Sequence, residues 1–176
     1  MAASSTYVPI ATQTLGSAAQ TVTFSSIPST YTDLILVIQF IEGSTATIAN
    51  GCLRFNTDGY ATNTNYSSTK MTGNGTSVTS TRTTGVDGLY WDFDTTTTTT
   101  TIRFSIHNYA NTNVNKSVLF RQDNASQGAQ CSVALWRNTA AINQIVVVGS
   151  DQAPVSGISD SFSIGSTFTL YGIASA

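Results

Sequence analysis

Three aspartates lie close together near the middle of the chain: Asp87, Asp92 and Asp94. On an extended strand, residues two apart share one face, so the carboxylates of Asp92 and Asp94 are expected to point the same way. Oxygen ligands of this kind suit Ca²⁺, and paired carboxylates also serve as the acid and base of glycosidases. The simplest interpretation is a solvated strand face, because Trp91 and Phe93 alternate with the aspartates. We therefore predict no metal and no catalytic residue, and keep the three aspartates as calcium candidates.

Three tyrosines, Tyr66, Tyr90 and Tyr109, lie in or beside segments rich in Asn and Gly. Tyrosine rings stack on the faces of sugars, and neighbouring Asn and Asp side chains supply hydrogen bonds. These residues are therefore the glycan-binding candidates. The alternative, which is the commoner role of scattered aromatic residues, is that they pack in the core or at an interface.

His107 is the single histidine, and a Ser–His–Asp triad would need it as the base. No Gly-X-Ser-X-Gly motif accompanies it, so we expect a structural histidine. One histidine and two distant cysteines, Cys52 and Cys131, do not make a zinc site. Each cysteine adjoins apolar residues, and both are expected to be buried as small hydrophobic side chains. We predict no cofactor.

The elements that would position these residues read as strands, because alternation and β-branched runs dominate and 3.6-residue periodicity is missing. Asn74-Gly75 and Asp58-Gly59 mark turns. The pattern predicts an antiparallel β-sandwich, jelly-roll-like, with eight to ten short strands. The expected strands are residues 20–27, 33–41, 52–55, 89–93, 101–106, 116–121, 130–137, 142–148 and 166–173.

Four further segments carry expectations of their own. Residues 33–41 form a continuous apolar run, typical of a strand buried on both faces. Residues 138–143 are the one place that suggests a helical turn. The seven-threonine run, residues 95–101, is expected to lead into the strand that follows it. The polar start of the chain, about residues 1–8, is expected to be an arm that reaches a neighbouring molecule.

Composition excludes several classes of function. Only 9% of the residues are charged, against about 25% in an ordinary soluble domain. The net charge is -2 and the seven basic residues form no cluster, so we expect no nucleic-acid binding. The longest apolar run, residues 34–38, is too short for a membrane span. With no signal peptide evident, synthesis in the cytosol and one domain over residues 1–176 are expected.

Several segments resemble a family of small virion proteins of tailed phages, common among aquatic and cyanobacterial phages. The resembling segments are spread along the chain from end to end. Its segments are residues 10–17, 23–34, 53–56, 65–67, 108–112, 135–142 and 165–173, including Phe24-Ser25-Ser26-Ile27-Pro28 and Leu135-Trp136-Arg137-Asn138. The threonine run and the pair Asp92 and Asp94 depart from the family pattern.

The resemblance implies a β-sandwich that decorates a virion and has no enzymatic activity. Members look like capsid cement proteins in some settings and like tail or baseplate proteins in others. We expect a capsid decoration protein, because the chain has no coiled coil or repeat that would form a fibrous stem. The alternative is a tail, baseplate or fibre-associated component that binds host-surface glycans. The expected partners are other virion proteins and further copies of this chain, with a homotrimer favoured.

Overall fold

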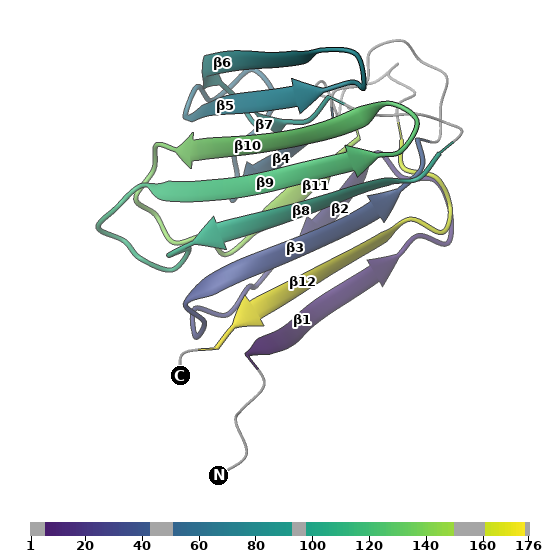
Figure 1. Cartoon of the computed structure of the whole chain (residues 1–176). Coiled ribbons are helices and arrows are strands. Elements are labelled where there is room, and N and C mark those ends of the chain that lie inside the picture. The colour runs from purple at the N-terminus through teal and green to yellow at the C-terminus, as the bar shows by residue number, and fades with distance from the viewer. Residues whose placement is uncertain (1–5, 43–50, 93–97, 150–160, 175–176) are drawn as a thin grey trace.

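The computed structural model describes residues 6–42, 51–92, 98–149 and 161–174, and these residues form two antiparallel sheets (Figure 1). The large sheet has eight strands, in the spatial order β1 (Tyr7–Thr14), β12 (Thr167–Ile173), β3 (Asp33–Phe40), β8 (Thr100–His107), β9 (Lys116–Asn124), β10 (Gly128–Trp136), β5 (Tyr66–Gly73) and β6 (Val78–Val86). The small sheet has four, in the order β2 (Thr21–Phe24), β11 (Ile145–Val148), β4 (Cys52–Phe55) and β7 (Leu89–Tyr90).

The two sheets stack as a sandwich, with the small sheet behind the middle strands of the large one (Figure 1). Apolar side chains from both sheets form one core between them, because each strand turns alternate residues inward. In β8, for example, Ile102, Phe104 and Ile106 are fully buried. Phe104 stacks on Phe120 of the neighbouring β9, with ring centroids 4.9 Å apart.

The β5–β6 hairpin forms one end of the large sheet. Its turn is held by the side-chain oxygen of Asn74, which accepts hydrogen bonds from the backbone N–H groups of Thr76 and Ser77 at 3.0 and 2.9 Å. Gly75 has a φ of 87°, a conformation that costs glycine no steric strain. β6 pairs only with β5 and is exposed over most of its length, because the small sheet does not extend behind it.

The predicted all-β sandwich is confirmed, with twelve strands in place of eight to ten. β1, β5 and β6 were not expected from the sequence. The start of β1 includes the last residues of the expected arm: Tyr7 and Val8 pair with Ile173 and Gly172 of β12. Thr6 accepts a hydrogen bond from the Ala174 backbone at 3.0 Å, and residues 1–5 of that arm lie outside the described residues.

Two local expectations are wrong. Residues 138–143 form no helical turn; the backbone carbonyl of Ala141 instead accepts a hydrogen bond from the Asn56 side chain at 3.0 Å, in a loop without regular structure. β3 is not buried on both faces, because Gln39 is exposed and Val37 is half-buried on the side away from the small sheet. Of the threonine run, Thr100 and Thr101 begin β8 as expected, and residues 95–97 lie outside the described part of the chain.

Candidate functional site

Asp87 is a structural carboxylate at the end of the small sheet. One of its oxygens accepts a hydrogen bond from the Ala61 backbone at 2.6 Å and lies 3.5 Å from the guanidinium of the buried Arg54. The other accepts the hydroxyl of Tyr90. With both oxygens occupied and its charge balanced by Arg54, Asp87 is not a ready ligand for calcium.

Asp92 is likewise occupied. Its carboxylate accepts hydrogen bonds from Lys70 and, at 3.1 Å, from the hydroxyl of Thr72. Its backbone N–H lies 3.1 Å from the amide oxygens of both Gln122 and Gln130. The expected solvated face is therefore wrong for Asp92, whose side chain is only 24% exposed and holds the segment after β7 against the large sheet.

The third calcium candidate, Asp94, lies outside the described residues, as does Phe93. Within the described residues, no group of three or more His, Cys, Asp or Glu side chains is placed to hold a metal ion. The structure places the other two aspartates, and each forms an ion pair with a different basic side chain. Asp87 pairs with Arg54, and Asp92 pairs with Lys70.

Two of the three candidate tyrosines cannot stack on a sugar in this conformation, because Tyr66 and Tyr109 are fully buried. The Tyr66 hydroxyl accepts a hydrogen bond from the Phe55 backbone at 2.8 Å, and burial raises the pKa of this phenol well above its usual value. The Tyr109 hydroxyl donates to the carbonyl of Pro28, and burial again raises the pKa. They belong to the core, the alternative that the sequence left open.

Tyr90 is half-buried, and its hydroxyl is committed to Asp87. Burial is the main cause that raises the pKa of its phenol, and the hydrogen bond to the Asp87 carboxylate adds to the shift. The three tyrosines therefore do not form a shared binding surface. Each stabilises a different junction between loops and strands.

His107 ends β8 and contacts Asp33 at the start of β3, with 3.5 Å between the imidazole Nδ1 and a carboxylate oxygen. The other carboxylate oxygen of Asp33 accepts the backbone N–H of Asn108 at 2.8 Å. Asn108 has a φ of 51°, so this contact fixes a turn of left-handed backbone. The arrangement is that of a structural histidine.

Both cysteines are free thiols, and only one of them is buried. Cys52 lies in the small sheet as expected, whereas Cys131 is exposed. The reason is that the inward positions of β10 hold polar residues: Gln130 and Ser132 are buried, and the Gln130 amide donates to the Ser132 hydroxyl at 2.8 Å. Cys131, between them in sequence, points to the opposite face.

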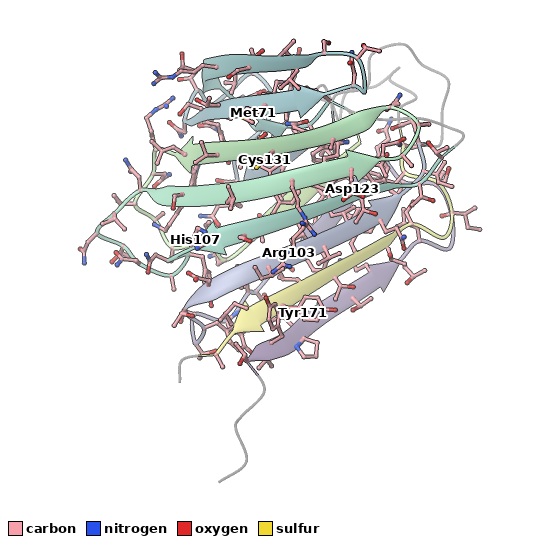
Figure 2. All side chains as sticks on the ribbon, viewed as in Figure 1. Met71, Arg103, His107, Asp123, Cys131 and Tyr171 are labelled. Carbon is pink, nitrogen blue, oxygen red and sulfur yellow. The ribbon has the colours of Figure 1, made fainter. Side chains whose placement is uncertain are left out.

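That opposite face is the outer face of the large sheet, on the side away from the small sheet (Figure 1). Figure 2 shows Met71, Cys131, Asp123, Arg103, His107 and Tyr171 across it, on β5, β10, β9, β8 and β12. Several large apolar side chains are exposed there. They are Met71, Val78, Leu119 and Val133, with exposed fractions of 58%, 74%, 48% and 56%.

The outer face has two adjoining shallow hollows. The larger, of about 550 Å³, lies between β5, β9 and β10 and includes Met71 and Val78 in its lining. The smaller, of about 220 Å³, lies toward β8 and includes Arg103 and Leu119. Arg121 and Cys131 line both hollows, so the two hollows adjoin at these side chains.

Two arginines on neighbouring strands line these hollows, and the guanidinium of Arg103 is turned away from Arg121, toward β1. Arg103 of β8 is the direct register partner of Arg121 of β9. Arg103 donates a hydrogen bond at 3.0 Å to the hydroxyl of Tyr7 on β1. Among the described residues, Arg121 has neither a hydrogen bond nor an ion pair within 4.0 Å.

Sequence reasoning did not single out this pair. Alternation along residues 101–106 does place Arg103 on the face opposite the buried side chains, but its pairing with Arg121 depends on the register of β8 against β9. The register in which two strands pair cannot be read from the sequence of either strand alone.

Comparison with models of protein families finds no match to this chain, and neither does a search of curated proteins. Within the described residues, no helix is long and apolar enough to cross a membrane.

Proposed function

We propose that this chain is a non-enzymatic structural protein of a tailed-phage virion, and specifically a capsid decoration protein that attaches through the outer face of its large sheet. The observation that carries the proposal is the exposure of Met71, Leu119 and Val133 on one broad face. Contiguous exposed apolar side chains on a folded protein commonly mark an interaction surface.

The shape of this face suits attachment to another protein. A stable interface buries roughly 800 Å² on each partner, an area that a face of several long strands supplies. The hollows are shallow, and the side chains around them are mostly apolar or hydroxyl-bearing. Such a surface favours a broad protein contact over the deep, polar-lined cavity of an enzyme.

The resemblance to virion proteins, together with a composition of 9% charged residues, supports a protein present in many copies on a particle. Closed symmetry is the usual form of such assemblies, and we propose a homotrimer, with other virion proteins as partners. The outer face would contact the capsid.

Immunogold labelling of intact phage particles tests the location. Gold spread over the head is the expected result. Gold confined to the tail would replace the capsid proposal with the tail or baseplate alternative, and no labelling of particles, intact or partly disrupted, would reject a virion role.

Substitution of Val133 tests the docking face. Val133→Asp puts a carboxylate at the middle of the outer face, and we expect at least a tenfold loss in the amount of protein bound to particles. Val114→Asp is the matched control, because Val114 is also exposed, at 46%, but lies in the β8–β9 loop. Equal binding of both variants and the wild type would reject the outer face as the attachment surface.

A further inference from the structure

We propose that β6 pairs edge to edge with β6 of a second copy of this chain, in antiparallel orientation, so that two large sheets join into one. The proposal concerns the free edge of the sheet and not its outer face, so it does not rest on the virion role. β6 lies at the end of the large sheet, with β5 as its one neighbouring strand, and is exposed over most of its length (Figure 1). Such an edge presents backbone N–H and C=O groups that another strand can bond.

The hairpin turn shows which backbone groups of β6 point away from β5. In an antiparallel pair, opposite residues alternate between those that share hydrogen bonds and those that do not. The backbone N–H of Asn74 donates to the carbonyl of Ser77 at 3.2 Å, so these two residues form a hydrogen-bonded pair. From the turn the register continues without a shift as far as Thr84. The residues of β6 whose N–H and C=O groups point outward are therefore Val78, Ser80, Arg82 and Thr84.

The other strand edges are poorly suited to pairing. β1, at the opposite end of the large sheet, contains Pro9, which has no N–H, and its register against β12 shifts between Pro9 and Ala11. β2 and β7, the edges of the small sheet, have four and two residues. Prolines, bulges and short edge strands all prevent pairing between molecules. β6 has nine residues and no proline, and is the edge best suited to accept another strand.

The single charged residue of β6, Arg82, does not close this edge. Charged side chains on an edge strand can block the approach of a second strand. Arg82, however, borders a shallow hollow on the outer face together with Thr69 of β5 and Val133 of β10. Its side chain therefore lies over its own sheet, and the backbone beside it stays accessible.

The side chains of β6 favour the same strand of a second copy as the occupant. Thr79, Thr81 and Thr83 share one face of β6, because they alternate along an extended strand. A two-fold axis at Thr81 would place Thr81 opposite Thr81 of the second copy, and each Thr79 opposite a Thr83. Cross-strand pairs of threonines stabilise antiparallel sheets, so this face of β6 is complementary to itself.

The same register uses all four outward-pointing residues. Val78 would lie opposite Thr84 of the second copy, and Ser80 opposite Arg82, so that no two charges directly oppose each other. Each of these pairs can form two backbone hydrogen bonds. An axis at Arg82 would instead oppose two arginines, which destabilises a sheet, and an axis at Ser80 would place Thr84 opposite the turn. We therefore expect the axis at Thr81.

The strength of the association follows from its size. A contact one strand wide is smaller than the roughly 800 Å² that each partner buries in a stable interface. We therefore expect an association that is weak in dilute solution and increases with concentration. A two-fold contact is separate from the three-fold contacts of the proposed homotrimer, and it would link one trimer to another.

Sedimentation over a range of concentrations tests the pairing. The mass of wild-type protein is expected to rise with concentration. Ser80→Pro removes an N–H that points away from β5, so it should abolish the rise and leave the hairpin paired. Ser80→Ala keeps the N–H and is the matched control. Thermal unfolding checks that both variants are folded.

Disulfide cross-linking tests the register, in a Cys131→Ser background because Cys131 is exposed. Thr81→Cys would face its own copy across the axis and is expected to form a covalent dimer at least ten times faster than Thr79→Cys. Thr79→Cys is the matched control on the same face, since its two copies would lie about 13 Å apart along the strands, beyond the reach of a disulfide. A mixture of Thr79→Cys and Thr83→Cys should restore cross-linking.

These measurements need no phage particles, so their result is independent of the virion role. Loss of association in Ser80→Pro but not in Ser80→Ala would support pairing through the backbone. Equal association of Ser80→Pro and the wild type, or equal cross-linking of Thr81→Cys and Thr79→Cys, would reject it. Cross-linking of Thr81→Cys to a different protein on particles, with no dimer of this chain, would overturn the choice of a second copy.

Discussion

At the scale of single residues, the carboxylate of Asp87 organises the end of the small sheet. It balances the guanidinium of Arg54, whose side chain is only 2% exposed, and it accepts hydrogen bonds from Ala61 and Tyr90. Removing one member of a buried ion pair leaves the other charge in a medium of low dielectric constant, which is costly.

Asp87→Ala is therefore expected to lower the free energy of unfolding by about 3–5 kcal/mol. Tyr90→Phe removes a single hydrogen bond to a charged group and should cost only about 1.5–3 kcal/mol. Urea denaturation of the two variants measures the difference. Asp87→Ala combined with Arg54→Met should recover part of the loss, and equal costs for the two single variants would argue against an ion-pair role.

Residue types predicted the chemistry of this molecule less well than they predicted its fold. Asp87 and Asp92 were noticed as aspartates close in sequence, but their partners, Arg54 and Lys70, come from other strands. Tyr66 and Tyr109 lie beside polar loops and are nevertheless buried. Which side chains meet depends on strand order and register, and neither is contained in the local sequence pattern.

At the scale of elements, the strands with clean alternation were predictable and the edge strands were not. β8 has one apolar face and one polar face, and the predicted strand at residues 101–106 lies within it. β6 is exposed on both faces over most of its length, and its sequence, VTSTRTTGV, does not alternate between apolar and polar residues. The sequence pattern therefore gives no sign of a strand there. β1 contains Pro9, a residue that argues against a strand except at a sheet edge, where β1 lies.

The packing of β12 gives a test at this scale. A Cβ atom at Gly172 would lie 2.3 Å from ring carbons of Tyr31, so Gly172→Ala must displace that ring or the strand. We expect a loss of about 1–3 kcal/mol in the free energy of unfolding, as for other overpacked sites. Gly16→Ala is the control, because no atom lies within 4 Å of the added carbon. Thermal unfolding that does not distinguish the two variants would contradict this packing.

At the scale of the whole molecule, buried phenols link stability to alkaline pH. Tyr66, Tyr90 and Tyr109 have a usual pKa of 10.0, and burial raises all three in the folded protein. Above pH 10 the unfolded chain therefore loses protons that the folded protein keeps, so stability falls as the pH rises. Above pH 10, the proton that buried Tyr66 keeps lowers the free energy of unfolding by about 1.4 kcal/mol for each further pH unit.

We expect cooperative unfolding on titration above pH 10, with the part of the tyrosinate absorbance that comes from Tyr66, Tyr90 and Tyr109 appearing together with the loss of sheet signal. Lys116 acts in the opposite sense, because burial lowers its pKa from 10.5, but its contribution ends once the unfolded lysine is also neutral. Tyrosinate absorbance that reached its full value while the sheet remained intact would show that the phenols are accessible to solvent.

The β5–β6 hairpin extends beyond the small sheet, and this affects the order in which the strands unfold locally. β6 is bonded on one side only and is exposed over most of both faces, whereas β3 and β8 lie mid-sheet over the core. Local opening free energies follow buried contact, so β6 is the strand of the large sheet that detaches at least cost. Amide hydrogens should therefore exchange in a gradient, fastest in β6, slower in β5 and slowest in β8, and brief detachment of the hairpin leaves the rest of the sandwich folded.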